Sequence, residues 1–365
     1  MRPSQISGDG LGPPSPGGKR LTLGISLLPE TGTPDAAAEG MKRILIGALT
    51  TLAVAVIWIV AAYERDVGAA RQRVSIGSVV VQTRCGPIEY AERGKGLPVL
   101  VVHGAGGGFD QGLLLGARLI DHGYRVVAVS RFGYLRTPLP ADASAEAQAD
   151  AHACLLDALG IDRAPVFGVS AGGPSTVQFC LRHPDRCSAM ILMVPLAYPA
   201  KAADRLPPSA QFFLERVTQS DFLMWAGARV LRTRMVETVL GTPAEDVRLG
   251  SEADRRRVYT MLDEILPVSS RAKGLMNEGA VARALRPLPL DRISAPALIA
   301  SVANDGYGTY AGARYTAEHV PGARFIGYAR GGHMLVGHED EFAAETVRFL
   351  DALRPGVPTD SSGSW

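Results

Sequence analysis

The residue best suited to chemistry is a serine in a glycine-rich turn. Gly168-Val169-Ser170-Ala171-Gly172 fits the pattern G-x-S-x-G, directly after a short apolar run and directly before a helical pattern. A serine at such a turn is lifted clear of the preceding strand, and the free N–H groups of the following helix favour developing negative charge. The pattern predicts that Ser170 is a nucleophile. A glycine-rich turn capped by a serine is the alternative interpretation.

A histidine and an aspartate further along the chain are the candidate base and acid. His333 comes directly after two glycines that follow the last predicted strand, where it could accept the proton of Ser170. Asp305 is the only carboxylate in the Asn-Asp-Gly segment after the preceding strand, and it would fix the imidazole tautomer. His338, closer to the last predicted helix, is a rival to His333. The Asn-Asp-Gly segment is also compatible with a plain turn.

Short apolar runs that alternate with helical patterns predict the fold that positions these residues. Such alternation is typical of a parallel sheet covered by helices on both faces, here with an inserted helical block over 196–288. Predicted strands are 74–83, 87–92, 98–102, 125–129, 165–169, 189–194, 297–302 and 323–328, and helices lie near 111–122, 143–159, 172–181, 309–319 and 340–353. The α/β core therefore comprises 74–195 and 289–354.

The N-terminal region contains a membrane-type segment. Residues 44–63 are 20 positions without a charge, enough to span a bilayer core, and Lys42 and Arg43 before them predict a cytoplasmic N-terminus with the remaining chain outside. A signal peptide cleaved after Ala62 and a buried soluble helix are the alternatives. Met41 is a second candidate start. We expect a polar linker over 64–73, and the Gly-, Pro- and Ser-rich residues 1–40 and the tail 355–365 to be disordered.

Four segments together resemble the α/β-hydrolase superfamily: His103–Gly106, Ser130–Tyr134, Gly168–Gly172 and Gly331–His333. The resemblance covers residues 77–353 apart from the insert. It implies a mostly parallel sheet of about eight strands, with the insert as a cap over the site. The order Ser170, Asp305, His333 is the order of nucleophile, acid and base in this superfamily.

The resemblance also assigns an oxyanion hole, formed by the backbone N–H groups of Ala105 and Ala171. Gly106 is a candidate substitute for Ala105, because glycine-rich versions of this loop vary in register. A phosphate-binding loop is a poorer explanation of these glycines, since the Lys-Ser/Thr ending of a Walker motif is missing. We expect structural roles for His103, which would hold the loop, and for Arg131, which would bind carbonyl and carboxylate groups near the site.

A serine nucleophile implies an acyl-enzyme, and the apolar residues of the cap suit a small or medium apolar carboxylic ester. A cofactor-free perhydrolase or C–C bond hydrolase with the same residues is the alternative, and a non-catalytic ligand-binding or scaffold protein is the alternative of another class. No cofactor or metal is expected. The formal charge of +2 argues against nucleic acid as a partner, which leaves a small-molecule ester and the membrane; the oligomeric state is not indicated.

Four cysteines lack the spacing of a zinc site. Cys180 and Cys187 flank a His-Pro-Asp turn, and an oxidising compartment would allow a short-loop disulfide between them. We slightly favour two buried thiols over this bond.

Overall fold

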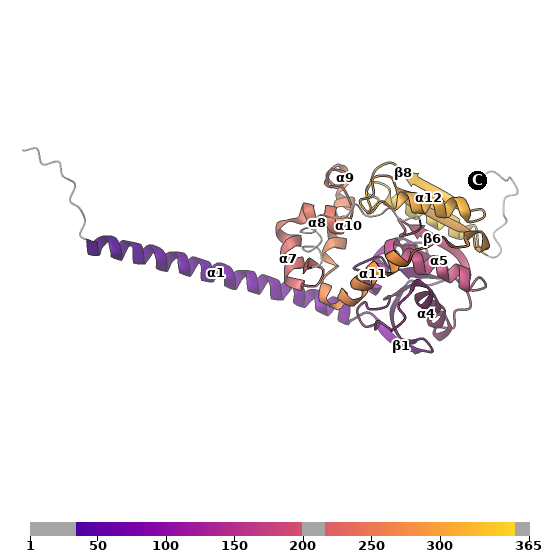
Figure 1. The fold of residues 1–365 in the computed structure, drawn as a ribbon, viewed down its shortest axis with the longest axis horizontal. Helices are drawn as coiled ribbons and strands as arrows, with labels where there is room; N and C mark the ends of the chain where they lie inside the picture. The colour runs from indigo at the N-terminus through magenta and orange to yellow at the C-terminus, as the bar shows by residue number, and fades with distance from the viewer. Residues whose placement is uncertain (1–33, 199–215, 355–365) are drawn as a thin grey trace, which may run out of the picture. The chain divides into compact units, whose positions relative to one another are not determined.

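The computed structural model describes residues 34–198 and 216–354 (Figure 1). The chain divides into two compact units, Met1–Trp58 and Ile59–Trp365. The predicted disorder of the tail 355–365 and of most of the extension 1–40 falls outside the described residues, as does part of the insert, 199–215.

An eight-stranded sheet forms the centre of the larger unit, with strand order β1-β2-β4-β3-β5-β6-β7-β8. The strands are β1 Val79–Thr83, β2 Gly86–Arg93, β3 Pro98–Val102, β4 Arg125–Val129, β5 Ala164–Val169, β6 Cys187–Met193, β7 Ala297–Val302 and β8 Arg324–Tyr328. The β1–β2 and β2–β4 pairs are antiparallel and the other pairs are parallel. All eight strands were predicted, and the mostly parallel α/β architecture is confirmed.

Helices cover both faces of this sheet. The buried apolar residues of α4 (Ala145–Ala158), α5 (Gly173–Arg182) and α12 (Tyr310–His319) pack on one face. Those of α2 (Phe109–Leu115), α3 (Ala117–Asp121) and α13 (Glu339–Asp351) pack on the other. This two-sided cover explains why the central strands are continuous apolar runs and do not alternate.

The described residues between β6 and β7 are helical, as predicted for the insert, and α7, α8 and α10 form a separate helical layer (Figure 1). The helices are α7 Asp221–Val230, α8 Arg232–Val239, α9 Ala244–Leu249, α10 Glu252–Asp263 and α11 Ala272–Ala284. Serines fix two of their starts: Ser220 accepts from the N–H of Leu223, and Ser251 forms a capping box with Asp254.

Helix α1, Pro34–Ser75, corrects two predictions. Residues 34–40 are helical, although we placed them in a disordered extension. Residues 64–73 are also helical, and the predicted linker is wrong. Val67 and Ala70 are buried in the apolar core of the insert, while Asp66 accepts a hydrogen bond from Trp225 Nε1 at 2.9 Å. These contacts pack the end of α1 against the insert, and β1 therefore begins only at Val79, five residues later than predicted.

One described helix, α1, is long and apolar enough to cross a membrane, with a mean hydropathy of 2.6 in its most apolar window. The large apolar side chains of the predicted span are exposed, among them Ile44, Leu52 and Trp58. A soluble core helix would bury such side chains, so the alternative of a buried soluble helix does not fit α1.

The four cysteines form two disulfides, Cys85–Cys154 and Cys180–Cys187. The preference for free thiols at Cys180 and Cys187 is therefore wrong. The turn between α5 and β6 brings their Cα atoms to 5.1 Å, within the usual range for a disulfide. The Cys85–Cys154 bond, which ties the β1–β2 turn to α4, was not predicted, because its partners are 69 residues apart.

Candidate active site

Ser170 lies at the carboxyl end of β5, where the chain turns into a short 3₁₀ segment and then α5. Its φ of 51° is in the left-handed region, a strained conformation for a residue with a Cβ atom. The two glycines of the motif have steric reasons. A Cβ atom on Gly168 would lie 2.2 Å from Thr176 Oγ1, and one on Gly172 would lie 2.5 Å from the carbonyl oxygen of Val102.

The structure brings the three predicted residues Ser170, His333 and Asp305 into one hydrogen-bonded chain. His333 Nε2 lies 2.9 Å from Ser170 Oγ, and His333 Nδ1 lies 2.8 Å from Asp305 Oδ2. Asp305 and His333 are buried, whereas Ser170 is partly exposed. This arrangement leaves Ser170 accessible and shields the groups behind it from water.

The Asp305 carboxylate is held ionised by its partners. Burial opposes ionisation, but the attraction of His333 and hydrogen bonds from His333, Thr309 and the Tyr307 N–H outweigh it, so the pKa of Asp305 is below its usual value. Tyr307 N donates to Oδ1 at 2.8 Å, and the Thr309 hydroxyl donates to Oδ2. With Oδ2 facing Nδ1, the ionised carboxylate favours the tautomer that carries its proton on Nδ1.

His338, the rival to His333, has other partners. Its ring is stacked on Tyr328 with centroids 4.1 Å apart, and its Nδ1 lies 3.5 Å from a carboxylate oxygen of Glu341. It precedes α13 at the N-cap position. Between the two histidines, the hydrogen bond to Ser170 belongs to His333.

The loop after β3 lies against the serine. A Cβ atom on Gly104 would be 3.1 Å from Ser170 Cβ, so the main chain of this loop approaches Ser170 closely. The N–H of Ala105, the next residue, has no protein acceptor among the residues that the structure describes. Ala171 is adjacent to Ser170 in the first turn before α5. Gly106, the candidate substitute, is buried with a φ of 74°.

His103 and Arg131 hold this loop, as expected. His103 Nε2 accepts a hydrogen bond from the Arg131 N–H at 3.0 Å, which places the proton on Nδ1, 2.6 Å from the Gly104 carbonyl. Burial, together with nearby Arg131, lowers the pKa of His103 well below its usual value, so the ring is neutral. The Arg131 guanidinium donates to the carbonyls of Ala171 and Gly104 and pairs with Glu278 of α11. It therefore links the serine turn to the β3 loop.

Sequence reasoning missed a set of contacts from the insert to the two loops that carry Asp305 and His333, which follow β7 and β8 and are called the acid loop and the base loop below. The carbonyl oxygen of Gly241 accepts hydrogen bonds from the N–H groups of Gly306 at 2.8 Å and His333 at 3.2 Å. Thr242 Oγ1 accepts from the Met334 N–H at 3.0 Å. The signal for this segment was weak: a Gly-Thr-Pro turn within a helical block.

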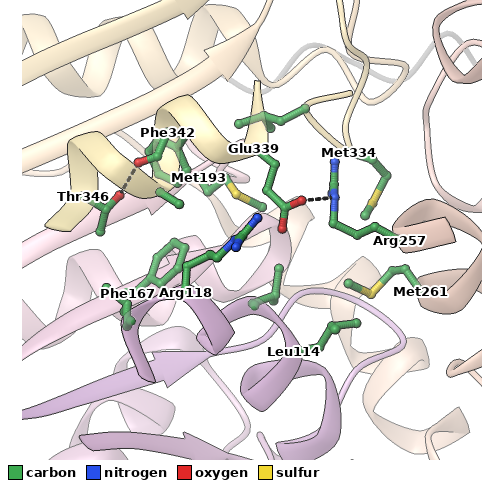
Figure 2. A pocket seen from close by; sticks show the side chains of 14 residues that line it. Leu114, Arg118, Phe167, Met193, Arg257, Met261, Met334, Glu339, Phe342 and Thr346 are labelled. Carbon is green, nitrogen blue, oxygen red and sulfur yellow. Dashed lines mark hydrogen bonds and ion pairs between the residues drawn. The ribbon is translucent and has the colours of Figure 1, made fainter. Parts of the chain in front are cut away.

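A small cavity, about 40 Å³, lies between the sheet and the insert (Figure 2). It is lined mainly by apolar side chains of α2, α3, α10 and α13, and the Arg257–Glu339 ion pair at 2.5 Å borders it. Ser170, Asp305 and His333 are not among its lining residues. The cavity has room for only a few water molecules, so we regard it as a packing gap. Within 34–198 and 216–354, no cluster of three His, Cys, Asp or Glu side chains forms a metal site.

Comparisons with known proteins identify the fold family of the chain. The profile of the α/β hydrolase fold family matches residues 98–340. An uncharacterized hydrolase of Bacillus subtilis, YcgS, is 28% identical over 280 residues, which cover 73% of this chain and 94% of the relative. The 2-hydroxy-6-oxo-6-phenylhexa-2,4-dienoate hydrolase of Comamonas testosteroni is 34% identical over 113 residues, 30% of this chain and 40% of that enzyme.

The solved structures lead to the same family. An α/β hydrolase fold protein from Nakamurella multipartita superposes with a TM-score of 0.61 at 25% identity, covering 75% of this chain and 99% of that protein. Because the family profile covers more than half of the chain, the chain belongs to the α/β hydrolase fold family.

Proposed function

We propose that this protein is a serine hydrolase that cleaves a small or medium, apolar carboxylic ester through an acyl-enzyme. The hydrogen-bonded chain from Ser170 Oγ through His333 to Asp305 carries this proposal. Ser170 Oγ attacks the ester carbonyl carbon while His333 Nε2 takes its proton. The same proton then goes to the departing alcohol, and the acyl group stays on Ser170 until a water, deprotonated by His333, releases the acid.

The negative charge of the tetrahedral intermediate needs hydrogen-bond donors. We assign them to the N–H groups of Ala105 and Ala171, in line with the close approach of Gly104 to Ser170 and with the Ala105 N–H having no protein acceptor in the described part of the chain. One such donor contributes about 3 kcal/mol to lowering the barrier. Asp305 stabilises the imidazolium that forms when His333 takes the proton.

C–C bond hydrolysis is the second candidate function. It is favoured by the similarity to the Comamonas testosteroni hydrolase, which is named for a 2-hydroxy-6-oxo dienoate substrate. That likeness covers only 40% of the relative, so we rank the ester first.

Labelling with a fluorophosphonate probe tests the serine mechanism. The wild type should be labelled at Ser170, the Ser170→Ala protein should not, and heat-denatured wild type should lose the reaction. A folded wild type that does not react would favour a non-catalytic member of the fold. p-Nitrophenyl esters of graded chain length, assayed beside a 2-hydroxy-6-oxo dienoate, then separate ester hydrolysis from C–C hydrolysis.

We further propose that α1 anchors the protein in a membrane, with its N-terminus cytoplasmic and the hydrolase outside. Support comes from the apolar run over 44–63, the preceding Lys42 and Arg43, and two disulfides, which persist in oxidising compartments. Alkaline carbonate extraction and protease accessibility of intact cells test this placement. Release of a soluble chain that begins at residue 63 would instead support signal-peptide cleavage.

A further inference from the structure

We propose that Asp246, in helix α9 of the insert, is a positioning residue that fixes the acid loop against the base loop; the inference rests on the serine mechanism proposed above. Asp246 lies 59 residues before Asp305 and 87 before His333 in the sequence. Its carboxylate is buried and touches both loops.

One oxygen of this carboxylate joins the two loops. Asp246 Oδ2 accepts hydrogen bonds from Asn304 Nδ2 at 2.6 Å and from the Gly331 N–H at 3.0 Å. Asn304 Oδ1 in turn accepts from the Gly332 N–H at 2.9 Å. Asn304 directly precedes Asp305, and Gly332 directly precedes His333. The hydrogen bond between Asn304 and Gly332 therefore joins the two residues that directly precede Asp305 and His333.

The base loop needs such a restraint because of its own sequence. Gly331 and Gly332 have φ values of 127° and 59°, and a Cβ atom on Gly332 would lie 2.7 Å from Thr242 Cα. Glycine allows this tight path, but it also gives the loop more conformational freedom than any other residue would. The preceding glycines cannot by themselves aim His333, so external hydrogen bonds have to do so.

A structural role at the start of α9 is the alternative explanation of Asp246. It lies in the first turn of that helix, where a carboxylate is commonly found. However, its oxygens bind Arg330, Asn304 and Gly331, all outside the helix. Arg330 binds the other oxygen, Oδ1, from the solvent-exposed side. This contact does not connect Asp246 to the acid loop.

The rate of fluorophosphonate labelling of Ser170 in the full chain tests the inference without knowledge of the substrate. Asp246→Ala should lower this rate about 100-fold, a loss that a misplacement near 1 Å can cause. Asp246→Asn keeps an acceptor oxygen for Asn304 and Gly331 and should stay within a few-fold of wild type. Arg330→Ala, the matched control on the exposed side, should do the same. On a p-nitrophenyl ester the loss should fall on kcat, with KM nearly unchanged.

Asn304→Ala is a second variant that tests the same link, and it can be used if Asp246→Ala does not fold. It breaks the same link and should be similarly slow, and the double variant should be no slower than either single variant, because both remove one restraint. Wild-type labelling by Asp246→Ala, or losses that multiply in the double variant, would overturn the inference and leave the serine mechanism standing. An unreactive wild type would instead overturn the mechanism and, with it, the role of Asp246.

Discussion

Replacing Asp305 with asparagine tests the proposed mechanism most directly, because the structure dictates how the amide must orient. Asp305 Oδ1 accepts from the Tyr307 N–H at 2.8 Å, so an NH₂ group at that position would face another donor. The amide oxygen must therefore stay there, which places the NH₂ group at the position of Oδ2, 2.8 Å from His333 Nδ1. His333 Nδ1 must then accept, and the ring proton moves to Nε2.

A proton on Nε2 faces Ser170 Oγ across the 2.9 Å hydrogen bond, so the ring can no longer take the serine proton. The wrong tautomer in such an arrangement lowers kcat by about 10⁴-fold. This corresponds to about 5 kcal/mol of barrier. We expect a loss of this size in both fluorophosphonate labelling and p-nitrophenyl ester hydrolysis at pH 7, with an unfolding midpoint close to that of wild type.

Thr309→Val is the matched control. It removes the hydroxyl that donates to Asp305 Oδ2 but leaves the carboxylate and the His333 hydrogen bond, so its rate should fall less than about 10-fold. A folded Asp305→Asn protein that labels within 10-fold of wild type would refute the tautomer argument. His338→Ala, which removes a ring stacked on Tyr328, should leave the rate unchanged.

Three further predictions concern stability. Replacing Cys85 and Cys154 with alanine should cost about 4 kcal/mol in urea unfolding, against about 2.5 kcal/mol for the other disulfide, because the closed loops span 69 and 7 residues; equal costs would contradict the loop-entropy argument. Val67→Asp should destabilise the fold by about 3–5 kcal/mol, since it places an unpaired charge in the apolar core of the insert, whereas a linker would tolerate it. Burial raises the pKa of Asp246, but hydrogen bonds from Asn304, the Gly331 N–H and Arg330 outweigh this effect and lower the pKa. Asp246→Asn should therefore be less stable than wild type at pH 7, and urea unfolding should show the difference shrinking as the pH falls below about 3.9 and through the folded pKa.

The sheet and the serine turn were predictable because their signals are local. Each buried strand is a run of β-branched or apolar residues, and parallel strands in a covered sheet need no other pattern. Ser170 was found from five consecutive residues and their flanks. The positions of Asp305 and His333 followed from the chain order that the family resemblance supplied and from the glycines beside them.

The linker prediction is wrong because the charged side chains of this segment are paired within the protein and not all exposed to solvent. Between residues 64 and 73, three charged side chains find partners in the insert. Asp66 pairs with Arg229, Arg71 with Asp221, and Arg73 donates to the Leu266 carbonyl at 2.6 Å. The apolar stripe Val67, Ala70 and Val74, at helical spacing, was the signal that could have identified a packed helix.

The contacts of Asp246 and the Cys85–Cys154 bond were beyond local reasoning. Asp246 meets Asn304 and Arg330 across 58 and 84 residues, and the disulfide closes across 69. Asn304 and Arg330 become neighbours only because the carboxyl ends of β7 and β8 lie side by side, and the disulfide forms only because α4 packs against β1. Spacing along one chain carries no information about such pairs.

Backbone strain gathers at the same edge of the sheet. Three of the described non-glycine residues with positive φ lie there. Ser170 directly follows β5, Val194 directly follows β6, and Leu335 lies two residues after His333. Such conformations cost about 1–3 kcal/mol each and persist only where the surroundings impose them. Val194, whose branched side chain makes its φ of 43° least favourable, turns the chain so that the Leu196 N–H reaches the Ser170 carbonyl at 2.9 Å. The strained backbone at Val194 thus allows a hydrogen bond from outside the serine turn that holds the turn in place, as expected of a preorganised site.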